Sequence, residues 1–291
     1  MAQSLQQLKA RINSSNGIAK ITKAMEAIAA SKIKTARKSV EKTRAYEEKI
    51  RYVVQKILAD TDIAKLRNTF LEDRLEFLNE QKPDASAPKK LFFIISPDKG
   101  LCGGLVSNIV KKAAELVTEN DYVVCIGKKI EKASAKMGHN IIASFPMGTG
   151  YPEYNSIYPM INLAVSYYVS VQVASVVLIY APFKNAFVQE VTAQTLMPIT
   201  PDENFKNSHH RYLFEPSPLA VLERILPYYI EVEFFNALKN AHASEQAARV
   251  AAMSAAKDNA LEISQTLTTA YNKIRQEKIT NEILDLASAQ I

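Results

Sequence analysis

Glycine and proline are confined to the middle of this 291-residue chain. All 12 prolines lie between Pro83 and Pro227, and seven of the 8 glycines lie between Gly100 and Gly150. Glycine weakens a helix because it adds backbone freedom, and proline ends one because it lacks a donor and clashes with the preceding turn. Because Gly17 is the one such residue outside this stretch, the sequence predicts two long helices around a compact middle domain.

Both ends of the chain show apolar residues at helical spacing. We expect the first helix from near Gln3 to near Leu58 and the last over residues 219–291, with a kink at Pro227. At about 1.5 Å per residue these helices would span roughly 80 Å and 100 Å. The rest of the chain is too small to cover them. The apolar residues whose spacing predicts the first helix are Leu5, Leu8, Ile12, Ile18, Ile21, Met25, Ile28, Val40, Tyr46, Ile50, Val53 and Ile57. Those that predict the last helix are Leu222, Ile225, Tyr229, Val232, Phe235, Leu238, Ala241, Ala248, Ala255, Ile263, Leu267, Ile274 and Leu286. An alanine-dense stretch from Ala241 to Ala256 is where we expect the two helices to wind round each other.

The middle of the chain alternates strands with helices, which predicts a mostly parallel sheet with both faces covered. Strands are expected at residues 91–96, 122–126, 141–145 and 176–180, and a last one within 187–199. Helices are expected at 106–117, 128–137 and 157–169. The expected organisation is a first helix (1–60), a linker (61–90), an α/β domain (91–200), a return segment (201–218) and a last helix (219–291).

Residues 155–183 carry no charge and resemble a membrane span in length. Serine, asparagine and glutamine interrupt this segment, whereas a spanning helix needs about 20 predominantly apolar residues. We therefore interpret it as a buried helix followed by a buried strand, without membrane insertion.

The glycine loop at residues 99–105 has the pattern of a structural turn. Gly100, Gly103 and Gly104 do not have the spacing of a dinucleotide or phosphate loop, so a tight structural turn is the favoured interpretation. Cys102 is expected to be a small buried residue, and the histidines show no metal-ligand spacing. We therefore expect no catalytic, cofactor-binding or metal-binding residue. A nucleotide-dependent enzyme built on the α/β domain stays as an alternative.

Positive charge is concentrated in the first 60 residues, which hold 13 Lys and Arg against 5 Asp and Glu. Such a surface suits an acidic partner. A nucleic-acid-binding protein is one alternative, although the aromatic residues that stack on bases are limited there to Tyr46 and Tyr52.

Four segments, in order along the chain, resemble the gamma subunit of F-type ATP synthases. They are residues 21–32, residues 98–104 with Ser107 and Asn108, residues 243–253 with Asp258 and Asn259, and residues 271–276 with 279–282. The resemblance covers almost the whole chain, and four motifs in the right order are far more specific than one glycine loop.

This resemblance implies an α/β fold with long N- and C-terminal helices in an antiparallel coiled coil and a central Rossmann-like domain. It implies a central-stalk rotor of a proton-translocating ATP synthase, without an active site. The implied partners are the alpha and beta subunits, the epsilon subunit and the c-ring, with no nucleic acid. Mg-ATP and Mg-ADP would bind on the partner subunits and no cofactor on this chain. The implied location is peripheral, on the cytoplasmic side of the cell membrane. Contacts with the alpha/beta ring are implied for Lys23, Met25, Arg249, Arg275, Gln276, Thr280 and Glu282.

The sequence departs from the family pattern over residues 68–86 and at the C-terminus, which ends in Ser288, Ala289, Gln290 and Ile291. A related rotor devoted to ATP hydrolysis or mechanical work is therefore a further alternative.

Overall fold

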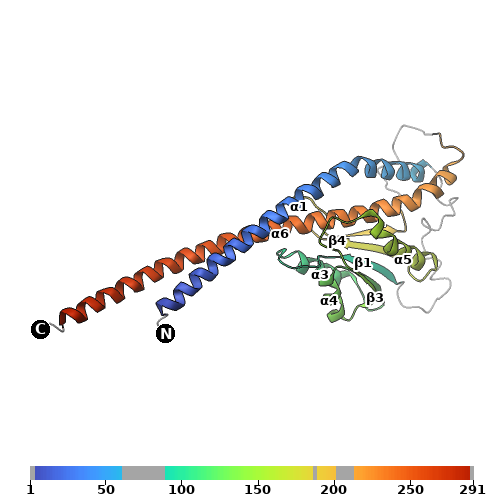
Figure 1. The fold of residues 1–291 in the computed structure, drawn as a ribbon. Helices are drawn as coiled ribbons and strands as arrows, with labels where there is room; N and C mark the ends of the chain where they lie inside the picture. The colour runs from blue at the N-terminus through green and yellow to red at the C-terminus, as the bar shows by residue number, and fades with distance from the viewer. Residues whose placement is uncertain (1–3, 61–88, 186–188, 201–212, 289–291) are drawn as a thin grey trace. The chain divides into compact units, whose positions relative to one another are not determined.

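The computed structural model describes residues 4–60, 89–185, 189–200 and 213–288. Most of the expected linker and return segment, and the departure at residues 68–86, lie outside these ranges. The described elements, drawn in Figure 1, are α1 (Leu5–Asp60), β1 (Lys90–Ile95), α3 (Leu105–Leu116), β2 (Tyr122–Ile126), α4 (Lys128–Met137), β3 (Asn140–Phe145), the 3₁₀ helix η2 (Tyr154–Ile157), α5 (Tyr158–Val169), β4 (Ser175–Tyr180), β5 (Thr192–Met197) and α6 (Pro218–Ser288).

The two long helices predicted from the glycine and proline distribution are present. Helix α1 has 56 residues and α6 has 71, close to the expected bounds. Gly17 lies inside α1, and α6 continues through Pro227 as one helix. Neither residue therefore ends its helix.

The sheet is mixed and its strand order is β3-β2-β1-β4-β5. β1 pairs in parallel with β2 and β4, and β2 pairs in parallel with β3. β5 is an antiparallel edge strand on β4. The parallel strands are nearly continuous apolar runs because helices cover both faces of the sheet, so the α/β fold class is confirmed.

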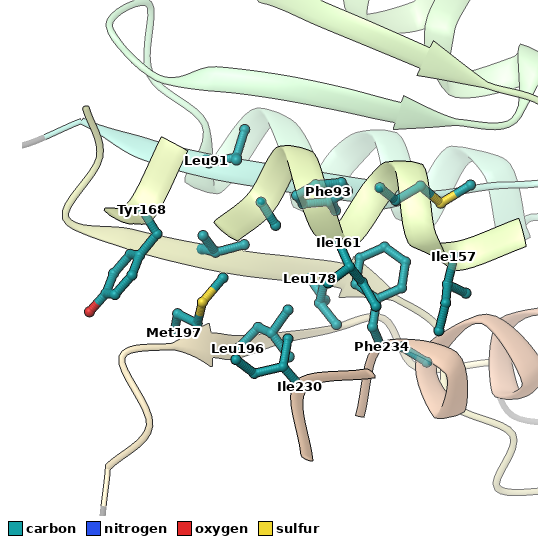
Figure 2. Close-up of a cluster of buried hydrophobic side chains, with 14 of the residues drawn as sticks. Leu91, Phe93, Ile157, Ile161, Tyr168, Leu178, Leu196, Met197, Ile230 and Phe234 are labelled. Atoms are coloured by element: carbon teal, nitrogen blue, oxygen red, sulfur yellow. The ribbon is translucent and has the colours of Figure 1, made fainter. Parts of the chain in front are cut away.

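Alternate residues of β1 belong to two separate cores. Helices α5 and α6 lie on one face of the sheet, and α3 and α4 lie on the other (Figure 1). Leu91 and Phe93 belong to the core that α5 and α6 cover, whereas Phe92 and Ile94 belong to the core under α3 and α4. In Figure 2, Phe93 and Phe234 of α6 point toward one another. Their rings meet edge to face with centroids 5.3 Å apart. Helix α6 is therefore part of the core of the α/β domain.

The uncharged segment at residues 155–183 forms α5 and β4. Ala164, Tyr168, Val176 and Leu178 within it are buried in the core shared with α6. Across the described ranges, each helix is too short or too polar to cross a membrane. The interpretation as a buried helix followed by a buried strand is confirmed.

The described residues group into two compact units. Unit 1 combines Met1–Ser31 with Arg249–Ile291, and unit 2 is Lys32–Ala248. Unit 2 holds the sheet, its covering helices and the adjoining parts of α1 and α6.

Candidate interaction surface of the long helices

The buried face of α1 follows a heptad repeat of mainly small and polar side chains. Leu8, Ser15, Thr22, Ala29 and Ala36 are spaced by seven residues, and each is at most 8% exposed. A repeat of seven keeps one face of a helix against its partner, and small side chains allow a close approach of the two backbones.

Side-chain bonds between α1 and α6 in unit 1 show that the helices are antiparallel. The α6 partners of residues 15 and 16 are residues 260 and 264, whereas the partner of residue 26, farther along α1, is the lower-numbered residue 257. The bonds join Ser15 Oγ to the Ala260 carbonyl oxygen (2.6 Å), Ser264 Oγ to Asn16 Oδ1 (2.8 Å) and Lys257 Nζ to Glu26 Oε2 (3.1 Å). The expected antiparallel coiled coil is confirmed. In unit 2, Ala241, Ala243, Ala247 and Ala248 of the alanine-dense stretch are buried.

A second face of α1 in unit 1 carries an exposed apolar stripe. Ile18, Ile21, Met25 and Ile28 are 51%, 62%, 37% and 59% exposed. The periodicity that predicts the helix placed them in one series with Leu8, but they lie on a different face. The larger apolar side chains point to solvent because the smaller ones occupy the helix contact.

The expected ring contacts lie on exposed parts of the two helices, with Arg249 half-buried. Lys23 and Met25 are two residues apart, which places them on nearly opposite sides of α1. Every residue of α6 from 275 to 284 is exposed. Within this stretch Thr280 Oγ1 donates to the Gln276 carbonyl oxygen (2.9 Å), Glu282 pairs with Lys278 (3.6 Å), and Arg275 is exposed. The contacts of all seven residues with other chains stay a prediction.

A basic groove of about 770 Å³ lies between α1 and residues 183–185 in unit 2. Its cations are Lys34, Arg37, Lys38, Arg44 and Lys184. Three of them have acidic neighbours: Arg37 pairs with Glu41, Arg44 with Glu48 and Lys184 with Glu190. The groove keeps an excess of positive charge, which suits an acidic partner surface.

At the carboxyl end of the sheet, the carboxylate of Asp98 occupies the position where an anionic ligand would bind. It accepts hydrogen bonds from three backbone N–H groups, those of Lys128 (2.9 Å), Met147 (3.3 Å) and Gly148 (2.8 Å). Lys128 is the first residue of α4, and the N-terminus of a helix attracts anions. The chain thus supplies its own anion at this helix end.

The glycine loop before α3 is a turn with two left-handed residues. Gly103 has φ 59° and Leu101 has φ 64°. A Cβ atom on Gly104 would meet no atom within 4 Å, and one on Gly100 would meet only the end of the Lys129 side chain. The close approach of backbone occurs instead at Gly127, where a Cβ would lie 1.9 Å from the Ser96 carbonyl oxygen. Gly127 was not predicted from the sequence as a site of close backbone approach. Its position directly after the apolar run that forms β2 is a signal that could have indicated one.

Cysteine and histidine have structural surroundings. Cys102 is buried, as expected, and Cys125 is buried as well. Burial raises the pKa of the Cys125 thiol and lowers the pKa of His139. Within the described ranges, His, Cys, Asp and Glu form no group that could hold a metal ion. His209 and His210 lie outside the described residues.

Comparison with known proteins identifies the family. The family model described as ATP synthase matches residues 4–290. An ATP synthase gamma chain from Halothermothrix orenii is 36% identical over 291 residues, covering 98% of this chain and 97% of the relative. The chain belongs to the ATP synthase gamma chain family. A gamma chain from Dehalococcoides mccartyi is 35% identical and covers 96% of this chain and 95% of that one. The family expected from the four motifs, and the central-stalk function that goes with it, are confirmed.

Solved structures of ATP synthases share the fold. The rotor of the Euglena gracilis mitochondrial ATP synthase matches with a TM-score of 0.68 at 18% identity, covering 94% of this chain and 98% of that one. The central stalk and c-ring structure from Tetrahymena thermophila matches with a TM-score of 0.55 at 26% identity, covering 81% and 99%. Both matches agree with the gamma-chain fold.

Proposed function

We propose that the chain is the non-catalytic rotor subunit of a proton-translocating ATP synthase. It couples rotation to ATP synthesis and hydrolysis at sites on beta subunits, which bind Mg-ATP and Mg-ADP. Its partners are the alpha and beta subunits around the long helices, and the epsilon subunit and c-ring at the α/β domain. The assembly lies at the cytoplasmic side of the cell membrane, where this chain is a peripheral component.

The exposed apolar stripe on α1 is the observation that carries this proposal. Ile18, Ile21, Met25 and Ile28 form a continuous apolar face on a helix whose contact with α6 is made by other residues. Contiguous exposed apolar surface marks an interaction site. A surrounding ring of alpha and beta subunits would cover this face and residues 275–284 of α6.

The different faces of α1 supply what rotary coupling needs. A rotor changes the nucleotide affinity of a beta subunit only if it contacts the open and closed states of that subunit unequally. The stripe is apolar, whereas Lys20 and Lys23 lie on another, basic side of the same helix. As the helix turns, one beta subunit therefore meets an apolar face and then a charged face. Lys23 and Met25 act on different beta subunits at any one moment.

The sheet supports a non-catalytic role. Asp98 occupies the N-terminus of α4, where a nucleotide phosphate would otherwise be attracted. A phosphate at this point would meet a carboxylate with the same sign of charge. This repulsion supports the proposal that nucleotides bind on the beta subunits rather than on this chain.

Reconstitution with alpha and beta subunits tests the proposal. The chain alone should show negligible ATP hydrolysis, and its addition to the two subunits should stimulate their hydrolysis. The variant carrying Ile21→Ser and Ile28→Ser should lose most of this stimulation, because it replaces the exposed stripe. Ala30→Ser is the matched control, since Ala30 is exposed on α1 outside the stripe.

Two results would overturn the proposal. One is ATP turnover by the isolated chain. The other is stimulation that the double variant retains at the level of the Ala30→Ser control. Urea unfolding of the isolated double variant should match that of the unmodified chain, because the replaced side chains are exposed, which separates lost assembly from lost folding.

A further inference from the structure

Arg51 of α1 and Glu233 of α6 form a two-pronged ion pair within unit 2. Arg51 Nε donates to Glu233 Oε1 (2.9 Å), and Nη2 donates to Oε2 (2.7 Å). Glu233 is only 3% exposed. Paired bonds between a guanidinium and a carboxylate fix orientation as well as distance. The pair therefore fixes one point of α1 against one point of α6.

The same carboxylate also bonds to the edge of the sheet. Gln194 of β5 donates from Nε2 to Glu233 Oε2 (2.9 Å), and its Oε1 accepts from the hydroxyl of Tyr180 on β4 (2.8 Å). A continuous series of polar bonds thus connects two strands of the sheet, α6 and α1.

A second ion pair of opposite polarity lies next to the first. Lys239 of α6 is fully buried and donates to Glu47 and Thr43 of α1. Its ammonium also lies 5.2 Å from the centre of the Phe235 ring. In the first pair the acid is on α6, whereas in the second pair the acid is on α1.

This alternation penalises sliding of one helix along the other by a turn. Glu47 and Arg51 are one helical turn apart on α1. A slip in one direction would bring Glu47 to Glu233, and a slip in the other would bring Arg51 to Lys239. The first slip would bring together two carboxylates that are both buried, where like charges repel strongly. The second would bring the half-exposed guanidinium of Arg51 against the buried ammonium of Lys239, which is also a repulsion between like charges. The pattern therefore favours one register and opposes its two nearest alternatives.

We propose that Glu47, Arg51, Glu233 and Lys239 are positioning residues that fix the axial register of α1 on α6. This inference rests on the proposed rotor function, because a rotor transmits torque only if its two helices and its sheet move as one body. Buried polar groups are best known for fixing the register of coiled coils. Gln194 extends the fixed register to the sheet.

Exchanging the charges of one pair tests the alternation directly. In the variant with Glu47→Lys and Lys239→Glu, each pair keeps opposite charges in the native register. A one-turn slip in either direction would now bring opposite charges together, so the penalty on both slips is removed. Exchanging both pairs, by adding Arg51→Glu and Glu233→Arg, restores the alternation and is the matched control.

Spin labels on Lys49→Cys and Tyr228→Cys report the register in the full chain. Both positions are exposed, one on each helix, while Cys102 and Cys125 are buried and will not react with the label. A slip of one turn displaces the helices by about 6 Å. We expect one distance population in the unmodified chain and in the four-residue exchange, and a second, displaced population in the two-residue exchange.

A single unchanged population in the two-residue exchange would overturn the inference, as would two populations in the unmodified chain. If that variant fails to fold, judged by its helical circular dichroism, Arg51→Glu with Glu233→Arg supplies the same test at the other pair. In the assembled ATP synthase, the two-residue exchange should retain ATP hydrolysis but pump fewer protons per ATP, and the four-residue exchange should recover the ratio.

The distance measurement uses the chain without partners, so it decides the register inference even if the rotor proposal fails. Conversely, a fixed register in a chain that does not stimulate alpha and beta subunits would contradict the rotor function alone.

Discussion

The Oδ2 atom of Asp98 accepts a hydrogen bond of 2.8 Å from the backbone N–H of Gly148. With its bonds to Lys128 and Met147, this carboxylate joins the end of β1 to the start of α4 and to the loop after β3. One side chain thereby organises the carboxyl end of the sheet.

Replacement of Asp98 by alanine should lower the free energy of unfolding by about 3 kcal/mol, because several backbone donors lose a charged acceptor. Asp98→Asn should cost less, since one acceptor oxygen remains. Urea unfolding followed by circular dichroism measures both, with Glu119→Ala as an exposed control. Equal stability of the alanine and control variants would contradict this assignment.

Gly127→Ala should destabilise the chain by at least about 3 kcal/mol. The residue has φ 106°, and the new methyl group would collide with the Ser96 carbonyl. Gly17→Ala is the matched control, because nothing lies within 4 Å of the added methyl group in α1. That control should stabilise the chain by about 0.5–1 kcal/mol, since alanine is the better helix former. Thermal unfolding of the two variants should shift in opposite directions.

Ala29→Leu should cost about 1–3 kcal/mol, because a larger side chain would force the closely packed helices apart. Ala29 is only 1% exposed, whereas the adjacent Ala30 is exposed. Ala30→Leu should therefore change the free energy of unfolding by less than about 0.5 kcal/mol. Chemical denaturation compares the pair. A tolerated leucine at position 29 would show that the small residues do not determine helix spacing.

Stability should fall as the pH rises above about 10. Burial, followed by the Glu233 carboxylate, raises the pKa of Tyr180 and of Tyr229 to about 12. Between pH 10 and 12 the unfolded chain releases these protons while the folded chain keeps them, so unfolding becomes more favourable with each pH unit. Below pH 10 both states are protonated and the effect vanishes.

The variant Tyr229→Phe should remove about 1 kcal/mol per pH unit from this alkaline slope. Urea unfolding at pH 9, 10 and 11 measures it. Tyr46→Phe, at a position that is 60% exposed, serves as the control. An identical slope in both variants would exclude Tyr229 as a source of the pH dependence.

The sequence was sufficient to predict the elements and the fold class. Long helices followed from where Gly and Pro are absent, and the strands followed from short apolar runs such as β1 and β2. Because these signals are local and strong, tertiary contacts did not override the local preference for helix or strand. The helix contact was different. Its small and polar residues, Ser15, Thr22 and Ala29 among them, carry a weaker hydrophobic signal than the exposed stripe at Ile18 and Ile21.

The charged contacts between elements could not be predicted either. Glu233 and Gln194 are 39 positions apart, and Arg51 lies 182 positions before Glu233. Nothing in a single sequence marks such partners, because their meeting depends on the register of two helices and an edge strand. Asp98 could be placed within a motif, but its three backbone donors come from elements that only the fold brings together.

In unit 1, α1 leaves Ile18, Ile21 and Ile28 uncovered, whereas the smaller Ser15, Thr22 and Ala29 are buried. A polypeptide of this kind is at risk during biosynthesis, because the uncovered isoleucines can associate with any other apolar surface before the intended subunits arrive. Its abundance in the cell must therefore be matched to that of the subunits that cover it, and production in excess would yield aggregates.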